Sequence, residues 1–264
     1  MPFPKKERIV YEKNPLDEVV CQLRFPPILR IDSEIPVDFQ EKIRKDFPKF
    51  TETVELKVEL SSEASSPIPP EMLQNFIKGP GNRNYEFLSE DGLWKINLTR
   101  TFLALSSYKY QRWEEFRDML LLPFKALIEV YSPIYFSRLG LRYIDVIKRS
   151  NLNLEKVSWR ELLNPFILGV IGSSEVGDNV FDFENNYRLN LSDNGSIVRI
   201  ITKFVKSKES DEIYYMIDSD FFNPNKTKID DAFSKLDYFH ISASNLIQWC
   251  ITDTLSNAMK PEKI

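Results

Sequence analysis

The sequence predicts an α+β protein in which an antiparallel sheet is covered by long helices. Several short segments alternate apolar and polar side chains, which is typical of half-buried strands. Two longer segments carry apolar residues at helical spacing, and turn sequences such as EDG and DNG favour hairpins between neighbouring strands. The chain has 264 residues, 42% of them hydrophobic, which is enough for a core at the upper size limit of one domain.

The first part of the chain predicts strands and helices in turn. Residues 18–25 are β-branched and alternating, and the two prolines after them end a first strand. Residues 35–47 repeat an apolar side chain every four positions, which predicts an amphipathic helix that ends before Pro48. Further elements are a strand at 54–60, a short helix at 71–77, a strand from Tyr85 and a long strand from Leu93 to Tyr108.

Helical patterns dominate two later stretches. An apolar stripe from Trp113 to Tyr131 predicts a helix, which Pro123 should kink or split. The closing stretch, from Asp230 to Met259, predicts a second long helix. Between them lie a strand within 136–150, a short helix near Trp159 to Phe166, and strands at 196–205 and 212–222.

Two stretches of the chain resemble each other. NYEFLSEDG (84–92) and NYRLNLSDNG (186–195) each precede a strand and, later, a helix. An internal duplication explains the match, but so does the common use of these residues at hairpins. We expect an N-terminal α+β half (1–150), a connecting segment (151–184) and a C-terminal hairpin with a long helix (185–264), packed as one unit.

Composition excludes several classes of function. The net charge of -4 gives no overall field that would draw the protein to nucleic acid or anionic lipid. No stretch approaches the roughly 18 apolar residues of a membrane span, and no signal peptide is recognisable, so we expect a cytoplasmic protein without a membrane partner. The single histidine, His240, and the two cysteines, Cys21 and Cys250, are too few for a structural zinc site. We expect no cofactor.

Basic side chains gather on the predicted strands, whereas many acids lie on the helices. In the strand after Pro133, Arg138, Gly140 and Arg142 point to one sheet face. Gly140 would leave a notch between the two guanidinium groups that a planar anion or a partner's backbone could approach. Two explanations stay open. Either this face binds an anion or a partner, or its arginines pair with acids of the helices. Two further cations, Arg199 and Lys203, belong to the proposed surface.

Two aspartates are expected to form structural ion pairs. Asp145 shares the apolar face of its strand, so we expect a buried arginine partner, and loss of Asp145 should cost several kcal/mol of stability. Asp253 lies late in the predicted closing helix, where a carboxylate is electrostatically unfavourable. This position predicts a tertiary partner for Asp253, with an arginine of the sheet as first choice.

A metal-dependent nuclease is a further hypothesis. Glu55 and Lys57 form an E-x-K on a predicted strand, with Asp46 before it. Asp218 and Asp220 share a strand face and are weak candidates for a divalent-metal site. Such short motifs also occur by chance in a chain with 28% charged residues. We therefore assign no catalytic residue and no metal.

Three stretches carry a resemblance that covers nearly the whole chain. They are residues 14–31 together with 37–48, the segment RLGLRYIDVI (138–147), and ITDTLSNAM (251–259) with His240 upstream. They resemble a family of small bacterial proteins with sporadic distribution and no assigned activity. The resemblance implies no catalytic residues, and the scattered distribution is similar to that of mobile defence or toxin–antitoxin genes.

Together these observations predict a non-enzymatic protein-interaction component, as a subunit of a bacterial anti-phage defence or toxin–antitoxin assembly. It would hold a protein partner through sheet edges or the basic face. The alternatives are a nucleic-acid-binding module that uses the basic face, the metal-dependent nuclease, and a helix-grip protein that binds a small ligand between sheet and closing helix. A homo-oligomer is a further alternative.

Overall fold

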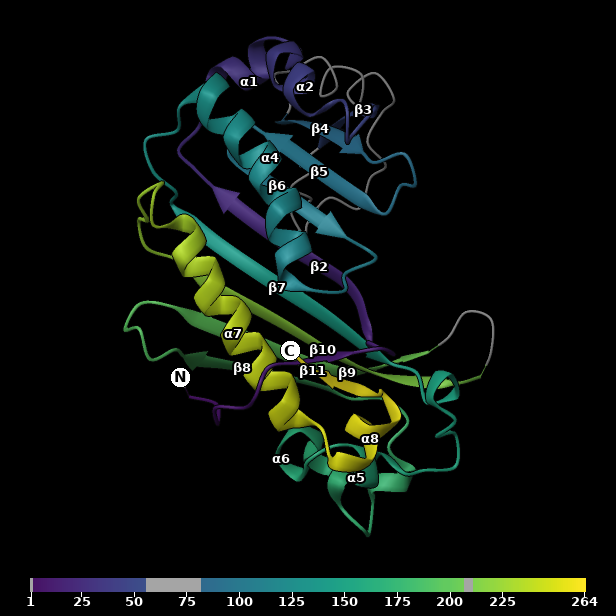
Figure 1. Cartoon of the computed structure of the whole chain (residues 1–264). Coiled ribbons are helices and arrows are strands. Elements are labelled where there is room, and N and C mark those ends of the chain that lie inside the picture. The colour runs from purple at the N-terminus through teal and green to yellow at the C-terminus, as the bar shows by residue number, and fades with distance from the viewer. Residues whose placement is uncertain (1, 56–81, 207–210) are drawn as a thin grey trace, which may run out of the picture.

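The computed structural model describes residues 2–55, 82–206 and 211–264, and its frame is a nine-stranded antiparallel sheet (Figure 1). The strand order is β3-β4-β5-β6-β2-β7-β10-β9-β8, and β1 and β11 form a separate pair. The strands are β1 (Ile9–Tyr11), β2 (Leu16–Arg24), β3 (Lys49–Glu55), β4 (Asn82–Leu88), β5 (Trp94–Thr99), β6 (Phe102–Ser107), β7 (Arg138–Ile147), β8 (Glu184–Asn190), β9 (Ile197–Lys206), β10 (Ile213–Asn223) and β11 (Pro261–Lys263).

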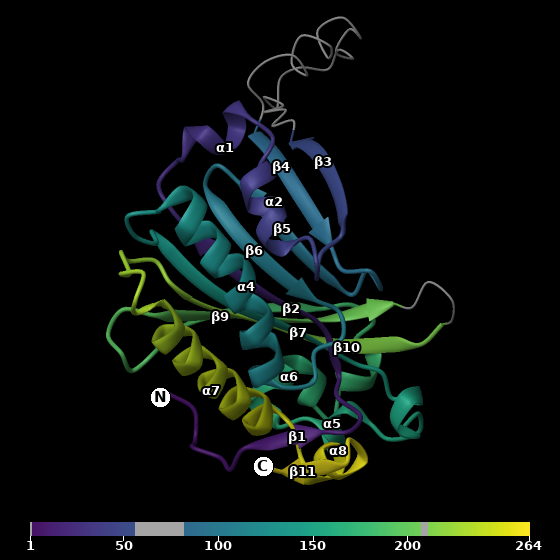
Figure 2. The ribbon, with the colours of Figure 1, turned by 45° about the horizontal axis from the view of Figure 1, so that its top comes forward.

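The helices gather on one face of this sheet. They are α1 (Leu29–Ser33), α2 (Val37–Ile43), α4 (Trp113–Tyr131), α5 (Trp159–Leu162), α6 (Pro165–Leu168), α7 (Ala232–Cys250) and α8 (Asp253–Ala258). The long helices α4 and α7 cross the same side of the strands, and α5, α6 and α8 lie together at one end (Figures 1 and 2). The predicted α+β fold with long covering helices is confirmed. No helix in the described part of the chain combines the length and apolar character needed to cross a membrane.

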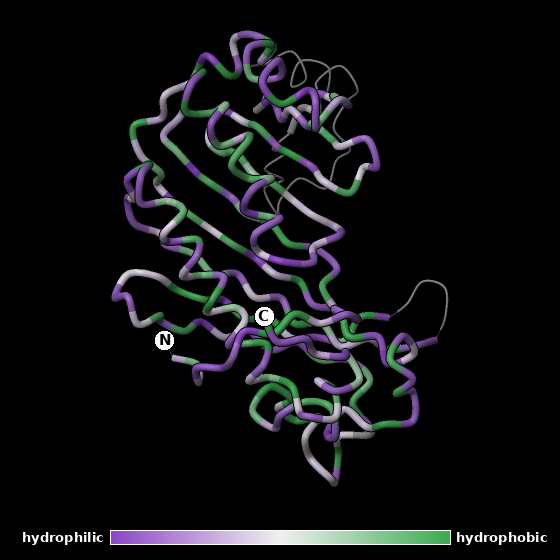
Figure 3. The backbone as a smooth tube through the Cα atoms, in the orientation of Figure 1, coloured by the Kyte–Doolittle hydropathy of each residue, from purple (hydrophilic) through white to green (hydrophobic). Residues whose placement is uncertain are grey.

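The two faces of the sheet differ in cover. We call the side under α4 and α7 the covered face; on β7 it carries Leu139, Leu141 and Tyr143, all buried. We call the other side the open face; on β7 it carries Arg138 and Arg142. Figure 3 shows hydrophobic and hydrophilic residues alternating along the central strands, as a sheet with one packed face requires.

The sheet repeats one arrangement of strands. In each half a central strand, β2 or β7, pairs with the last strand of a three-stranded meander, and a long helix follows. The first meander is β4-β5-β6 with α4, and the second is β8-β9-β10 with α7. The similar stretches 84–92 and 186–195 fall on corresponding hairpins, so the two halves share one hairpin-plus-helix arrangement. By this topology β7 opens the second half, although the predicted segment 1–150 includes it.

Aromatic and aliphatic side chains fill the space between the covered face and the helices. Phe116 and Leu120 of α4 and Leu236 and Phe239 of α7 have no exposed surface. Burial of each such side chain contributes about 1.5–3 kcal/mol. The stripe predicted for residues 113–131 is confirmed, and α4 is not split at Pro123.

Several predicted boundaries were wrong. The long strand from Leu93 to Tyr108 is two strands, because Thr99 Oγ accepts the backbone N–H groups of Thr101 and Phe102 at 3.2 and 3.1 Å and so closes a turn without glycine or proline. The helix predicted over 35–47 ends at Ile43. The helix at 71–77 and most of the strand at 54–60 lie outside the described residues.

The predicted closing helix is also interrupted. Ile251 leaves the helix to form a bridge with Leu163, and Thr252 is the N-cap of α8. Asp253 therefore lies in the first turn of a helix, where a carboxylate is favourable, and it is exposed. The reason for expecting an arginine partner does not hold, and the described residues contain no ion pair of Asp253.

The break predicts a specific role for Thr252. Its hydroxyl accepts from the backbone N–H of Leu255 and lies 2.7 Å from the carbonyl oxygen of Glu161, to which it donates. We expect Thr252→Ala to lower the free energy of unfolding by about 1–2 kcal/mol in urea titrations. Thr254→Ala, at an exposed position of α8, should change it by less than about 0.5 kcal/mol. Equal effects of the two substitutions would contradict this cap.

Candidate functional site

The residues predicted to bind an anion or partner all lie on the open face. Arg138, Gly140 and Arg142 are on β7, and Arg199 and Lys203 are on β9. The strand β10 runs between these two strands, and its register brings Asp220 directly opposite both Arg142 and Arg199. The structure thus gathers the predicted residues on three adjacent strands.

The two arginines of β7 pair with acids of the neighbouring strand. Arg142 donates from Nε and Nη2 to the two carboxylate oxygens of Asp218, at 2.7 and 2.6 Å, in a bidentate pair. Arg138 donates from Nη2 to Asp220 at 2.8 Å. The predicted pairing with helix acids is therefore wrong, because the partners lie one strand away on the same face.

The notch at Gly140 is filled by the protein itself. A Cβ atom at this position would collide with Nη1 of Arg138. The guanidinium group of Arg138 also lies over the ring of Phe222, at 4.7 Å from its centroid. Gly140 therefore lets the side chain of Arg138 cross to Asp220, and the space is not left open to an anion.

The predicted metal ligands are engaged as well. A cation at Asp218 and Asp220 would have to displace both arginines. Within the described residues, no group of three or more His, Cys, Asp or Glu side chains could hold a metal ion. Lys57 and the side chain of Glu55 lie outside the described part of the chain, so the E-x-K hypothesis stays a prediction.

Other cations of the open face form no ion pair with a carboxylate of the described residues. Arg24 lies directly opposite Arg138, and Arg188 lies directly opposite Arg199. Like charges in such positions destabilise a sheet. Arg199 donates to the amide oxygen of Asn186 at 3.3 Å, and neither Arg188 nor Arg199 forms an ion pair with a described residue. Part of the open face is therefore unbalanced in charge.

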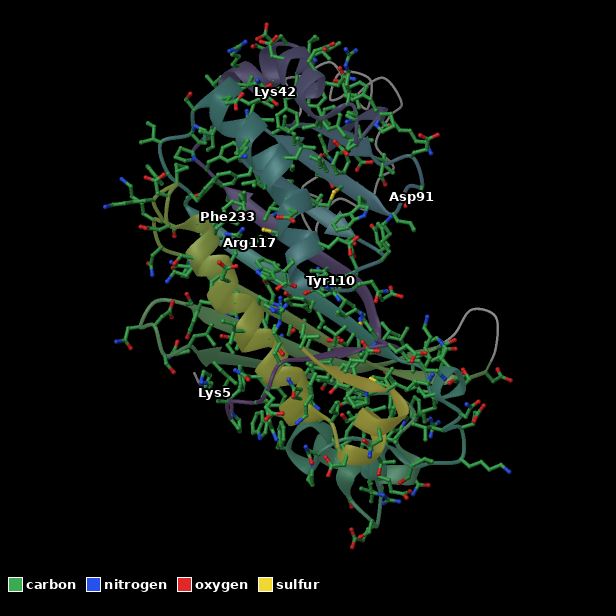
Figure 4. The ribbon with its side chains drawn as sticks, viewed as in Figure 1. Lys5, Lys42, Asp91, Tyr110, Arg117 and Phe233 are labelled. Carbon is green, nitrogen blue, oxygen red and sulfur yellow. The ribbon has the colours of Figure 1, made fainter. Side chains whose placement is uncertain are left out.

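A second candidate site lies on the covered face. A cavity of about 90 Å³, partly open to solvent, lies between β7, β10, α7, residues 110–113 at the start of α4, and residues 8–16, which we call the strap. Figure 4 shows Tyr110 at the start of α4, and Arg117 beside Phe233 where α4 meets α7. The cavity thus lies where the two halves of the molecule meet.

Among the described residues, Asp145 is the one acidic residue that lines this cavity. It projects from β7 on the covered face and is only 5% exposed. No described residue forms a hydrogen bond or ion pair with its carboxyl group, so the arginine partner predicted from the sequence is absent. Burial, with a smaller effect of the Asp218 charge, raises the pKa of Asp145 to about 7. The register of β2 and β7 shifts between Leu16 and Glu18, next to Asp145, and such bulges often lie beside functional sites.

Aromatic rings surround this carboxyl group. The hydroxyl of Tyr143 lies 3.2 Å from Nδ1 of His240, and the ring of Trp113 stacks on the imidazole at 5.1 Å. Tyr110 meets the ring of Tyr143 edge-on. Burial, together with the nearby cation of Arg8, lowers the pKa of His240 to about 4, so the imidazole is uncharged at neutral pH.

The strap forms the outer wall of the cavity. Its strand β1 pairs with β11, and Arg8 forms an ion pair of 2.7 Å with Glu114 at the start of α4. The backbone N–H of Lys6, just before the strap, donates to Asn245 of α7 at 2.9 Å. A second cavity, of about 290 Å³, shares Arg8, Trp113 and His240 with the first.

Sequence reasoning located Asp145 on the correct face and gave a pocket between sheet and closing helix as an alternative, but it did not place Asp145 in that pocket. Tyr143 and His240 are 97 positions apart in the chain, and no local pattern indicates that they meet. The available signals were a carboxylate on an apolar strand and a lone histidine on a mainly apolar helix. The two cysteines, Cys21 and Cys250, are buried, and burial raises the pKa of both thiols.

The fit of Arg138 over Gly140 can be tested with a double-mutant cycle. Gly140→Ala should displace the guanidinium group and lower the free energy of unfolding by about 1 kcal/mol, because the half-buried Asp220 loses its partner. In an Arg138→Ala background the same substitution should have almost no cost. Urea unfolding of the four proteins measures the coupling, and independent effects would contradict the arrangement.

Comparison with known proteins gives no assignment for this chain. No family model matches it, and no curated protein matches it. The resemblance to uncharacterised bacterial proteins therefore stays a prediction from the sequence.

Proposed function

We propose that the protein binds a small organic cation at Asp145. The observation that carries this proposal is a buried carboxyl group that faces a cavity and has no partner among the described residues. A carboxylate buried in this way costs several kcal/mol. The ammonium or guanidinium group of a ligand would offset that cost with a charge-assisted hydrogen bond.

The walls of the cavity favour a cation over an anion. Tyr11, Tyr110, Trp113 and Tyr143 line it, and aromatic faces attract cations by about 0.5–2 kcal/mol. The neutral imidazole of His240 adds no competing charge. Of the two arginines of the lining, Arg8 is already paired with Glu114, and Arg112 is exposed. This supports a binding protein of the helix-grip type.

The volume limits the buried part of the ligand. About 90 Å³ suits a head group of a few heavy atoms, and a larger ligand would extend toward the neighbouring cavity of about 290 Å³. A probe with three heavy atoms gains at most about 1.5 kcal/mol per atom, so its Kd is no lower than about 0.5 mM. Binding should therefore be measured at millimolar concentrations.

Asp145 also predicts how stability changes with pH. Its pKa is about 7 in the folded protein and about 4 in an unfolded chain. Between these values the folded state holds a proton that the unfolded state releases, so this contribution to stability is complete below pH 4 and is lost as the pH rises through 7. We expect Asp145→Asn to be more stable than the wild type at pH 8, by about 2–4 kcal/mol, and to lose this advantage near pH 4.

Urea unfolding of both proteins at the two pH values checks this expectation. The sequence alone predicted that loss of Asp145 lowers stability, whereas we now expect Asp145→Asn to raise it. The described residues place no arginine beside Asp145 that the substitution would leave unpaired. A variant that is less stable than the wild type at pH 8 would contradict the assignment.

Calorimetric titration with ethylammonium chloride tests the proposed function. At pH 8 the wild type should bind this probe with a Kd near 1 mM, and Asp145→Asn should bind it at least tenfold more weakly. Binding to the wild type should weaken at pH 6, because the carboxyl group is then mostly protonated. Sodium acetate should not bind.

A matched variant controls for the change in net charge. Asp38→Asn removes one carboxylate from the exposed side of α2, which does not line the cavity, and should bind the probe as the wild type does. Equal affinity of Asp145→Asn and wild type, or stronger uptake of acetate than of ethylammonium, would rule out the proposed site.

A protein-interaction role is a second, separate proposal. It is supported by the open face, which none of the described helices covers, and by Arg24, Arg188 and Arg199, which form no ion pair with a described residue. An acidic protein surface would neutralise these cations. Membership of a defence or toxin–antitoxin assembly remains part of this proposal.

A further inference from the structure

We infer that two copies of the protein pair antiparallel through the outer edge of β8, so that one sheet continues across a two-fold symmetric dimer. β8 is the last strand of the nine-stranded sheet, at its lower margin in Figure 1. Six of its seven residues are exposed. This surface is separate from the cavity at Asp145 and does not depend on ligand binding.

The edge of β8 has few of the features that keep sheet edges apart. Natural proteins protect an edge with charged side chains, most often lysine, with proline, with a bulge or with a short strand, because its free N–H and C=O groups would pair with another chain. The strand ENNYRLN contains no proline or lysine, and all seven residues pair with β9 without a register shift. A regular row of backbone groups is therefore available to a second strand.

The charges of β8 are complementary to those of an antiparallel copy. When the pairing is centred on Asn186, Glu184 of one copy lies opposite Arg188 of the other, and symmetry creates this pair twice. Arg188 lacks such a partner in its own chain, where it faces Arg199. A register centred on Tyr187 would place both charges opposite asparagines and neutralise neither.

The apolar side chains on the other side of β8 also face each other in this register. Tyr187 and Leu189 point to the covered side and are 39% and 37% exposed. Leu189 would lie opposite Phe183 of the second copy, whose ring packs against Phe204 at 4.6 Å. Burial of these side chains adds an apolar contribution to the backbone hydrogen bonds. Charge and apolar matching therefore select a second copy as the occupant of this edge.

Analytical ultracentrifugation of the full chain tests the dimer. The wild type should sediment as a dimer within the range of about 1–100 µM, which covers the affinities common for modest interfaces. Glu184→Arg would place two cations opposite each other twice, and Arg188→Glu would do the same with two carboxylates. Each substitution should weaken self-association at least tenfold.

Mixing the two variants is the decisive experiment. One variant carries only cations at positions 184 and 188 and the other only carboxylates, so both cross-strand pairs are satisfied in a heterodimer. An equal mixture should therefore assemble as tightly as the wild type, and the double variant Glu184→Arg/Arg188→Glu should self-associate again. No other register of β8 predicts this combination.

Matched substitutions on α2 serve as controls. Glu41→Arg and Arg44→Glu reverse the same charges in an exposed pair and should leave the sedimentation of the dimer unchanged. Circular dichroism melting checks that the β8 variants are folded, and the double variant replaces any that is not. A monomeric wild type at all concentrations, or folded variants that dimerise like the wild type or fail to combine on mixing, would overturn the inference.

Discussion

The antiparallel pairing of β2 with β7 is the interaction on which the rest of the structure depends. It joins two copies of one arrangement, each a central strand with a three-stranded meander and a helix. Because side chains alternate along a strand, this single register decides that α4 and α7 lie on the same side of the sheet. A slip by one residue would turn Leu139 and Leu141 from the core toward solvent. The core, the cavity and the open face therefore all depend on the register between β2 and β7.

The same pairing explains how the protein can bury a charge. Regular pairing of β2 and β7 stops where Leu16 and Glu18 shift in register, and Asp145 lies opposite this shift. There the strap, with its short strand β1, completes the wall. Among the described residues, Asp145 is the buried carboxyl group that has no partner, and it lies at the seam between the two halves. On the open face, by contrast, the buried carboxylate has a partner: both oxygens of Asp218 accept hydrogen bonds from Arg142.

Local patterns were sufficient to predict most elements of the fold. Alternation located the strands from residue 18 and residue 138, and the apolar stripe of α4 was correct to the residue. Side-chain caps were harder to foresee: Thr99 closes a turn and Thr252 starts a helix with residues that are also common inside strands and helices. The pairing of strands that are distant in the sequence could not be predicted from these local patterns.

At the candidate sites, too, local features were predictable from the sequence and non-local contacts were not. The alternation of Arg138, Gly140 and Arg142 correctly placed them on one face, but their partners depend on which strand lies beside β7, and a sequence alone does not reveal strand order. The apolar neighbours of Asp145 indicated that it is buried. Whether a buried carboxyl group meets an arginine or a cavity depends on segments that pack together only in the finished fold, here the strap and α7.

The pairing of β1 with β11 has a consequence for biosynthesis. Ile9 lies opposite Lys263, so the strap is made early but finds its partner strand only after nearly the whole described chain has left the ribosome. Until then the carboxyl group of Asp145 and the rings around it lack their outer wall. Nascent and truncated chains would therefore expose this pocket, and its closure marks the end of folding rather than its beginning.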